Sequence, residues 1–569
     1  MLFLLLVISL IISVVLTLGK SGNNYNKSVF YLGIIILLFF IAEILFVTPF
    51  HLIYNDEYIY ESAAKTMLYQ HEFGICSFSS KLYCVPNTIG FFHEPGGWPF
   101  IEAIGFYIFG VNGSVAFGEN LLIGIISIIF VFLISGILFD DINAQLMSAL
   151  IFSFMPLFDL YSRTAIIDMP LLLFELMAIY FSLLYMKTKK FYIGVTAILS
   201  AAYALAVKVD GIIIIPILLL VLLSSRYIFS GSEAKKKLIF TGYLIIIFIA
   251  VSTPALIFTY IASSHSFGVN VALGQPKFSF AYLANNSIHN ALFFLGSYNT
   301  VKTNYSYVYH VEFPIEITLV SVIGLISLYK LKLKREMFFL VGWFLIIFLF
   351  YSSYYGGGAL YGLGADMRYF LSDFACISII AGIGGAFIIS KSINYIKNNL
   401  PIFSKRKAYQ KLFAVSISII IIFDSIFQFS YIVSQPPSKI ATFSAERADE
   451  SFLLQQYNKI PPNCTVVTFK PPFWYIMNRS NIYASWLLVT KYNNSLYNIS
   501  HGCLYFDYGL SCYINYSDEG APDNYPEICN EIMSKYSTQK IATYHYTNFS
   551  WNVTFGLYKL EAKTAKNTT

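Results

Sequence analysis

Apolar residues along this chain fall in long blocks separated by short polar segments, and this pattern predicts a helical membrane protein. Each block holds about 16–25 residues, the length that a helix needs to cross the apolar core of a bilayer. Twelve blocks are present, over residues 1–18, 29–49, 115–139, 144–158, 164–186, 192–207, 211–228, 238–262, 315–331, 337–353, 369–390 and 412–433. We therefore expect an α-helical polytopic membrane protein with about 12 transmembrane helices.

The first block has two interpretations. It lacks a basic residue before the apolar run and a small-residue cleavage site after it. Both features favour a retained helix over a signal peptide.

The pattern changes at the end of the last block. Residues 434–569 mix polar and apolar positions and are rich in Tyr, Asn and Pro, which predicts a separate C-terminal domain of the α/β or α+β class. Within it, Cys464–Phe469 and Ile541–Tyr546 are expected to form strands, and Arg447–Tyr457 a helix. The transmembrane domain then covers residues 1–433, with an outer loop over residues 50–114 that carries interfacial helices.

Composition and charge agree with this organisation. Of the 569 residues, 57% are hydrophobic and 12% are charged, whereas an average soluble domain has about 25% charged residues. The net charge of +6 is less informative than its distribution, because alternate connections hold 19 basic residues and the longer opposite set holds seven. By the positive-inside rule the basic set is cytoplasmic. Residues 50–114, 263–314 and 354–368, together with both termini, are then expected to lie outside.

Two further patterns agree with this orientation. The tail carries eight Asn-X-Ser/Thr sequons, which are typical of an extracytoplasmic glycosylated surface; their asparagines are Asn463, Asn478, Asn493, Asn498, Asn515, Asn548, Asn552 and Asn567. Six of the seven cysteines lie in the predicted outer segments: Cys76, Cys84, Cys464, Cys503, Cys512 and Cys529. They predict disulfides, with Cys76–Cys84 as a local pair and three pairings open in the tail. Free buried thiols are the alternative.

The outer ends of the predicted helices carry most of the candidate chemistry, beginning with the adjacent carboxylates Asp56 and Glu57 after the second block. Such a pair is either a solvated helix end or a general base at the membrane surface. Desolvation beside lipid raises the pKa of a carboxyl group and makes it a stronger base.

A Pro- and Gly-rich segment around His93 follows in the same loop, before a short apolar run, Phe100–Phe109. This run is too short to span a bilayer and predicts a helix that lies in the membrane interface. A lone histidine such as His93 is more often structural than functional.

Ionisable residues also enter the predicted helices themselves. Arg163 and Asp168 precede or begin the fifth block, and Glu175 follows Asp168 by seven residues. Seven residues are close to two turns, so Asp168 and Glu175 share one helix face about 10 Å apart. Charged groups at this depth usually face a polar cavity, although an Arg163–Asp168 pair that only braces the loop is an open alternative.

Two cations complete the set. Lys208, followed closely by Asp210, and Arg368 are among the few basic residues of the predicted outer side, and both lie at helix ends. A lipid-linked phosphate at this level would need such partners. Snorkelling anchors are the alternative for either residue alone.

Taken in this order, these elements resemble the C-type membrane glycosyltransferases, in the branch of the protein O-mannosyltransferases and the lipid A aminoarabinose transferases. The residues similar to the family's motifs are the acidic pair Asp56-Glu57, His93-Glu94-Pro95 through Phe109-Gly110 for the His-Pro-Pro segment and its helix, Arg163 and Asp168, Lys208 and Gly211, and Arg368-Tyr369. Glu94 and Gly96 depart from His-Pro-Pro, and Ser372 and nearby residues replace the prolines that often follow Arg-Tyr in the family. The Trp-Trp-Asp signature of oligosaccharyltransferases is absent.

The resemblance implies transfer of a monosaccharide from a polyprenyl- or dolichyl-phosphate to a protein, lipid or glycan hydroxyl on the outer face of the cell membrane, with inversion. It implies that Asp56 is the base, supported by Glu57, and that Asp168, oriented by Arg163, shapes the pocket. The implied donor-binding residues are Lys208, Arg368, Arg163, His93 and Tyr369. No nucleic acid is expected as a partner. No ligand cluster indicates a catalytic metal, and a divalent metal remains an open alternative.

Three other classes of protein are consistent with parts of the pattern. A lipid or solute transporter or flippase also has many spans, but inverted repeats are expected there and none is visible. An adhesion protein would explain the sequon-rich tail but not the charges at one membrane boundary. An inactive glycosyltransferase-like scaffold differs from the enzyme only in its activity.

Overall fold

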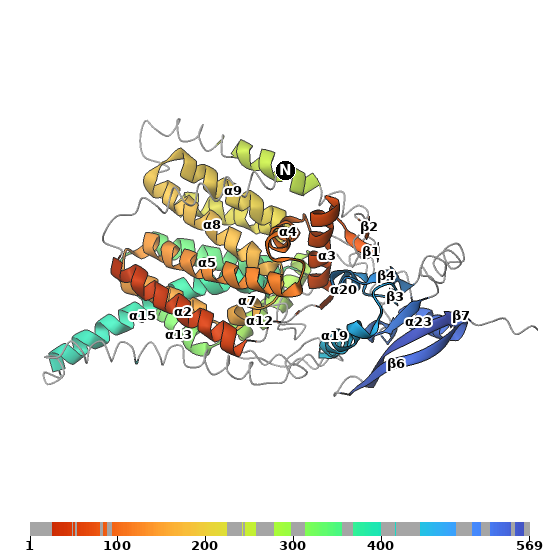
Figure 1. The fold of residues 1–569 in the computed structure, drawn as a ribbon. Coiled ribbons are helices and arrows are strands. Elements are labelled where there is room, and N and C mark those ends of the chain that lie inside the picture. Colours follow the sequence, from red (N-terminus) through yellow and green to blue (C-terminus); the bar gives the residue numbers. More distant parts are fainter. Residues whose placement is uncertain are drawn as a thin grey trace, which may run out of the picture.

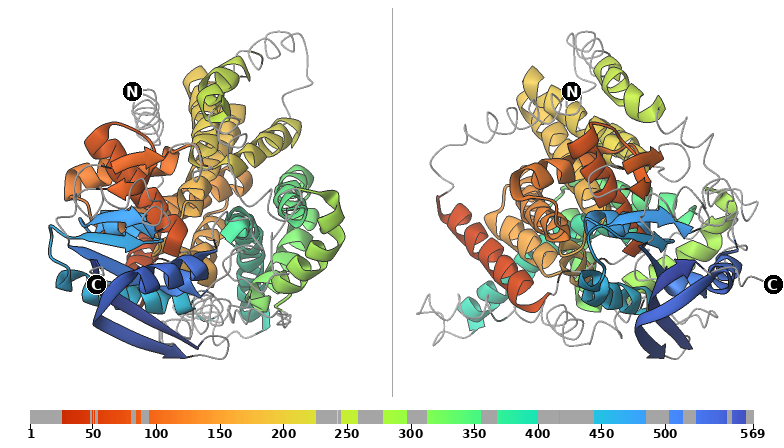
Figure 2. Two further views of the ribbon diagram at one scale, coloured as in Figure 1. Left: turned by 90° about the vertical axis from the view of Figure 1, so that its right-hand side faces the viewer. Right: turned by 45° about the vertical axis from the view of Figure 1, so that its right-hand side comes forward.

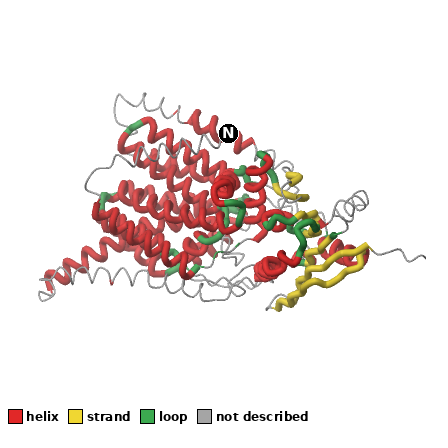
Figure 3. The backbone as a smooth tube through the Cα atoms, viewed as in Figure 1, coloured by secondary structure: helices red, strands yellow, loops and turns green. Residues whose placement is uncertain are grey.

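The computed structural model consists of a helical bundle with a β-sheet at one end (Figure 1, Figure 3). It describes residues 26–47, 54–79, 84–87, 94–224, 245–257, 278–296, 313–354, 368–399, 444–484, 503–513, 524–547 and 552–562, together with Pro49, His51, Gly242 and Ser416. Figure 2 turns the sheet end toward the viewer and shows the strands spread across the ends of the bundle helices.

The described bundle helices follow the apolar blocks of the sequence, except that α12 (Leu283–Phe294) lies in the expected outer loop over residues 263–314. They are α2 (Asn26–Phe46), α5 (Gly113–Phe139), α6 (Ile142–Ser153), α7 (Pro156–Ser162), α8 (Asp168–Thr188), α9 (Phe191–Val207), α10 (Ile214–Ser224), α12 (Leu283–Phe294), α13 (Ile315–Lys330), α14 (Lys334–Ser352) and α15 (Leu371–Asn399), with a further apolar helix over residues 245–257. The blocks at 1–18 and 412–433 fall outside the described residues, apart from Ser416.

Fewer helices than expected are long enough to cross a membrane by themselves. Among the described residues five helices have the required length and apolar composition, or six if α6 and α7 together form one span. The expected number of about 12 therefore stays a prediction.

One expected span is broken. The block over residues 144–158 predicts a single helix, but α6 and α7 meet at an angle of 64°. Pro156 is the first residue of α7; proline has no N–H and its ring clashes with the preceding turn, so α6 ends before it. The bend directs α7 toward the loop that leads to Asp168.

The sheet joins the tail to the first outer loop. Its seven strands have the order β2-β1-β4-β3-β5-β7-β6, and their bounds are β1 (Ile75–Ser79), β2 (Cys84–Asn87), β3 (Thr465–Thr468), β4 (Ser480–Tyr483), β5 (Leu504–Tyr508), β6 (Tyr536–Thr547) and β7 (Asn552–Ala562). The β3 strand is parallel to β4 and β5, and the other pairs are antiparallel. Because β1 pairs with β4, the loop after the second apolar block extends the sheet of the tail.

The helices of the tail are α19 (Ser444–Gln456), α20 (Pro471–Ile476) and α23 (Tyr525–Lys535). The expected helix at 447–457 and the expected strands at 464–469 and 541–546 correspond to α19, β3 and β6, so these local predictions are confirmed. The division of the chain at residue 433 stays a prediction.

Two disulfides hold the tail together. They join Cys464 to Cys503 and Cys512 to Cys529, which selects one of the three pairings that the sequence left open. Cys376 is a free, buried thiol in α15. The side chains of Cys76 and Cys84 lie outside the described residues, and their expected pairing stays a prediction.

We expect a Cys464→Ser/Cys503→Ser double variant to destabilise the tail by about 3–4 kcal/mol. The two cysteines are 39 residues apart, and without the bridge the unfolded chain between them gains conformational entropy. Limited proteolysis of the purified protein in detergent measures this as faster cleavage within residues 444–562. A Cys376→Ala variant is the control, since that thiol is unpaired. Cleavage rates equal to wild type would contradict a stabilising role for the bridge.

Candidate active site

Helix α3 (Tyr54–Gln70) lies between the bundle and the sheet (Figure 1). Asp56 and Glu57 occupy its first turn, where negative charge interacts favourably with the helix dipole. Residues four apart share a helix face, so Asp56 lies over Tyr60 while Glu57 lies over Glu61. The helix therefore carries one acidic face toward the bundle helices and another toward the tail.

A buried ion cluster stands at the end of the bundle nearest to α3. The Lys208 ammonium lies 2.7 Å from Asp168 Oδ1 and 3.3 Å from Asp210 Oδ2. Arg368 Nε lies 3.5 Å from the other oxygen of Asp168. Asp168 begins α8, Lys208 follows α9 and Arg368 precedes α15, so a single carboxylate connects three separate helices.

The charges of this cluster also act on Asp56. Burial raises the pKa of its carboxyl group above the ordinary value, and the nearby charges of Arg368 and Lys208 act in the opposite direction. Tyr60, one turn further along α3, feels the same surroundings, since burial and the charges of Asp56 and Glu94 raise the pKa of its phenol. A carboxylate that faces two cations in a desolvated site is placed for proton transfer.

Glu94 fixes the loop that carries Lys208. Its Oε2 accepts a hydrogen bond of 3.0 Å from the backbone N–H of Val209, the first residue of a 3₁₀ helix over Val209–Ile213. A carboxylate at the N-terminus of a helix satisfies a donor that has no partner within the helix. The residue that departs from the family's His-Pro-Pro pattern is thus a structural contact of the site.

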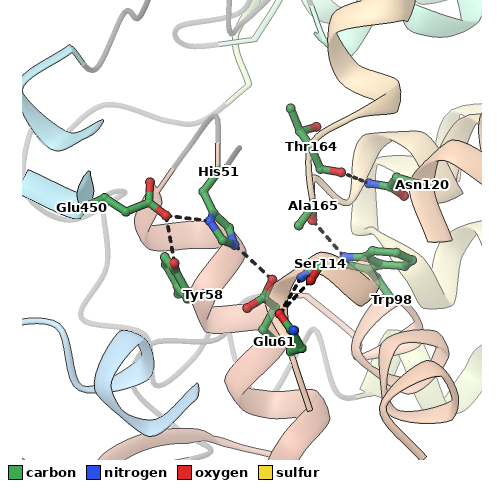
Figure 4. A network of polar contacts seen from close by, with 10 residues as sticks. His51, Tyr58, Glu61, Trp98, Ser114, Asn120, Thr164, Ala165 and Glu450 are labelled. Carbon is green, nitrogen blue, oxygen red and sulfur yellow. Dashed lines mark hydrogen bonds and ion pairs between the residues drawn. The ribbon is translucent and has the colours of Figure 1, made fainter. Parts of the chain in front are cut away.

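Two side chains hold the loop that precedes Asp168. The Asn120 amide donates to the carbonyl oxygens of Thr164 and Ile166 at 2.8 and 2.9 Å, and the Trp98 indole donates to that of Ala165 at 3.1 Å (Figure 4). Both side chains are fully buried. Their fixed donors determine where α8 begins, and with it the position of Asp168.

An aromatic wall lines the cations. The Tyr369 ring centroid lies 4.3 Å from the Lys208 ammonium and 5.1 Å from the Arg368 guanidinium carbon, within the range of cation–π attraction. The same ring stacks on Tyr351 at a centroid distance of 5.1 Å. Both tyrosines line a small cavity of about 10 Å³, whose lining also includes Asp168 and Glu175. Their shared helix face, expected from the spacing of seven, is therefore found.

Five of the residues selected from the sequence lie in one place: Asp56, Asp168, Lys208, Arg368 and Tyr369. Their functional roles stay predictions, but their proximity is a finding. Sequence reasoning missed Tyr351, which the sequence shows only as one of many aromatic residues at the end of an apolar block.

The expected pairing of Arg163 with Asp168 is wrong. Asp168 is paired with Lys208 and Arg368, whereas the charge that acts on Arg163 is that of Glu43 in α2. The reason is the break before α8: Arg163 caps the C-terminus of α7, so the two residues belong to different helices. Adjacent motif residues need not meet when a helix ends between them.

Glu57 and His93 are the remaining site residues that the sequence selected. The charges that act on Glu57 are those of His51, Glu450, Glu61 and Asp56, so it belongs to the His51 network. His93 lies outside the described residues, and its role stays a prediction. Within the described part of the chain, no group of three or more His, Cys, Asp or Glu side chains could hold a metal ion.

Comparison with known proteins finds a family model and solved structures that are similar to this chain. The family model of dolichyl-phosphate-mannose-protein mannosyltransferases matches residues 93–258, a segment that contains Asp168 and Lys208. No curated protein matches the chain. Among solved structures, the apo oligosaccharyltransferase of Archaeoglobus fulgidus is similar over 94% of this chain and 74% of its own, with a TM-score of 0.51 and 14% identity.

The resemblance to the C-type glycosyltransferases is confirmed. A second structure of the Archaeoglobus fulgidus enzyme, in complex with an inhibitory peptide and a dolichol-phosphate, covers the same shares of the two chains at 14% identity and a TM-score of 0.48. The family match over residues 93–258 indicates a glycosyltransferase. The solved structure shows the fold, and the apolar helices indicate a membrane protein.

A substitution of Gly211 tests how tightly the Lys208 loop is packed. A Cβ atom at Gly211 would lie 2.5 Å from the carbonyl carbon and oxygen of Ala204, so we expect Gly211→Ala to cost about 1–3 kcal/mol through overpacking. The measurement is the apparent melting temperature in detergent. Gly118→Ala in α5 is the matched control, because its Cβ would meet no atom within 4 Å. An unchanged melting temperature in Gly211→Ala would contradict the close approach.

The pH dependence of stability tests the burial of Glu57. Burial raises the pKa of this carboxyl group from 4.5 to about 8, against the lowering effect of His51. Because the folded state then binds the proton more tightly than the unfolded state, the contribution of Glu57 to stability falls as pH rises from 4.5 to about 8. We expect Glu57→Gln to gain in apparent melting temperature over wild type between pH 5 and 9. Exposed Glu531→Gln is the control, and a difference independent of pH would contradict the assignment.

Proposed function

We propose that this protein is a membrane glycosyltransferase that moves a monosaccharide from a polyprenyl- or dolichyl-phosphate carrier to a hydroxyl group of a protein, lipid or glycan. The observation that carries the proposal is the meeting of Asp56 with Lys208 and Arg368 around Asp168. A base opposite a cationic site is the arrangement that a displacement at an anomeric carbon requires. The match to the family of dolichyl-phosphate-mannose-protein mannosyltransferases supports this carrier.

The cations would bind the phosphate of the carrier. A lysine ammonium has three donors, and Asp168 and Asp210 hold Lys208 at 2.7 and 3.3 Å. Arg368 contacts Asp168 through Nε and the Tyr369 hydroxyl through one terminal nitrogen at 3.3 Å. The donors of these two side chains that point elsewhere can bind phosphate oxygens, and charge-assisted bonds of this kind are the stronger ones. In this role Asp168 orients the cations.

The reaction would be a single displacement. Asp56 accepts the proton of the acceptor hydroxyl while that oxygen forms a bond to the anomeric carbon and the bond from this carbon to the phosphate oxygen breaks. The electron pair of the broken bond stays on the phosphate, where Lys208 and Arg368 stabilise the added negative charge. Attack from the side opposite to the leaving phosphate inverts the anomeric carbon.

An outer location of the site agrees with the tail. Both tail disulfides require an oxidising compartment in most organisms, and the tail shares its sheet with the loop that follows α3. We propose that Asp56 and the tail lie on the same, extracytoplasmic side of the cell membrane. The eight sequons of the tail favour this orientation.

The test is transfer of radiolabelled sugar from polyprenyl-phosphate hexoses by the purified protein in proteoliposomes. We expect Asp56→Asn to reduce transfer by about 10²–10⁴-fold, the usual contribution of a general base. Asp140→Asn is the matched control, because Asp140 is an exposed carboxylate at the C-terminal end of α5. It should transfer as wild type does.

Two results would count against the proposal. Equal transfer by wild type and Asp56→Asn would remove Asp56 from the chemistry. Absence of transfer by wild type with every donor of a panel that covers hexoses, aminosugars and pentoses would favour a transporter or an inactive scaffold instead.

A further inference from the structure

We propose that the C-terminal domain positions the proposed base, because α19 and α20 grip helix α3 at Tyr58, between Asp56 and Tyr60, and α20 grips it again at Lys65. His51 and Glu450 are then positioning residues of the active site, although neither contacts the cation cluster. The effect on transfer rests on the proposed function, whereas the grip on α3 is a statement about the fold alone.

The first contact joins α19 to the beginning of α3 through a buried histidine (Figure 4). His51 Nδ1 lies 2.8 Å from Glu450 Oε1, and its Nε2 lies 3.0 Å from Glu61 Oε1. The Tyr58 hydroxyl donates to the same Glu450 oxygen at 2.8 Å. Glu61 and Tyr58 both belong to α3, so one carboxylate of the tail is connected to that helix at two points.

Packing makes this contact rigid. The rings of His51 and Tyr58 stack at a centroid distance of 3.9 Å, and Tyr58 meets Phe473 of α20 edge-on at 5.2 Å. Glu450 is 6% exposed and Glu61 is fully buried. Rotation of α3 about its axis would break several of these contacts together.

The charges of this network favour a doubly bonded imidazolium. Burial acts to lower the pKa of His51, but the carboxylates of Glu61 and Glu450 on either side raise it well above the usual value. The cationic ring can then donate one N–H to each carboxylate. Glu57 also faces this network, and the nearby Glu102 lies buried on α4 (Gly97–Phe109).

The second contact lies two turns further along α3. Lys65 is fully buried, and its ammonium donates to the carbonyl oxygen of Tyr475 in α20 and, at 2.9 Å, to Asn478 Oδ1. The same ammonium lies 4.0 Å from the centroid of the Tyr475 ring. A buried ammonium without these acceptors would be costly, so α20 and the second half of α3 are held together.

These two contacts hold the helix that carries the proposed base. The charge of Arg368 acts on Asp56 and Tyr60, whereas Tyr58 contacts Glu450 of the tail and Glu61 contacts His51. Because both faces belong to one short helix, the tail determines the angle at which Asp56 meets the cations. A displacement of about 1 Å in a catalytic geometry can cost on the order of 10²-fold in rate.

The first measurement is hydrogen exchange of the α3 backbone, which needs no substrate. We compare wild type with Glu450→Ala, which removes the oxygen that contacts both His51 and Tyr58, and with Glu450→Gln, whose amide oxygen can still accept from them. Peptides within residues 54–70 should exchange at least tenfold faster in Glu450→Ala and within threefold of wild type in Glu450→Gln, while peptides of α8 stay unchanged. Lys65→Met, which keeps the apolar stem, should accelerate exchange in the second half of α3.

The second measurement is steady-state transfer with the same variants in proteoliposomes. We expect Glu450→Ala to lower kcat at least tenfold with the KM for the lipid-linked donor within twofold, because the phosphate-binding residues are carried by the bundle. Glu450→Gln should restore kcat to within threefold of wild type. Exposed Glu531→Gln in the same domain is the matched control and should leave both constants unchanged.

The outcomes separate this proposal from the proposed function. Unchanged exchange of α3 in Glu450→Ala would overturn the grip itself. Faster exchange with unchanged kcat, in a protein whose Asp56→Asn variant is inactive, would overturn the positioning role. A parallel rise in donor KM would also overturn it, since this would indicate a general loss of the site. Transfer that is insensitive to Asp56→Asn would remove the proposed base while the exchange result stands.

Discussion

The ion pairs of the buried Asp168 carboxylate are the interaction on which the arrangement of the helices around the site depends. This carboxylate holds Lys208 and Arg368, and these three residues stand at the ends of three different helices. Breaking a buried ion pair by removing one partner leaves an uncompensated charge, at a cost of about 3–5 kcal/mol. The helices α8, α9 and α15 are therefore constrained to end at one level. A cationic pocket with an aromatic wall follows from this constraint.

Helix α3 connects that pocket to the rest of the molecule. One of its faces brings Asp56 to the cations, and the opposite face meets His51, Glu450 and α20. Backbone pairing in the sheet also joins the outer loop to the tail, since β1 of the loop pairs with β4 of the tail. The loop and the tail thus behave as one layer across the end of the bundle, and the proposed base lies where this layer meets the helices.

Some features were predictable because they depend on local sequence. The apolar blocks predict the positions of α2, α5, α8, α9, α10, α13, α14 and α15, but not that of α12, and the tail pattern predicts α19, β3 and β6. The block over residues 144–158 predicts one helix although it contains Pro156, because its apolar character continues across the proline. The structure breaks the helix there. The disulfide pairing was not predictable, since four cysteines allow three connectivities and spacing alone does not choose among them.

The sequence by itself determined which residues are available for chemistry: the carboxylates, cations and aromatic residues at the ends of apolar blocks, where charge is costly and seldom retained without a partner. Only the tertiary structure decided which of them meet. Asp168 pairs with Lys208 and Arg368 instead of Arg163, because helix ends and loop bends fix the direction of each side chain. The contact of His51 with Glu450 spans 399 residues, and no periodicity in a single sequence reports a partner at that separation.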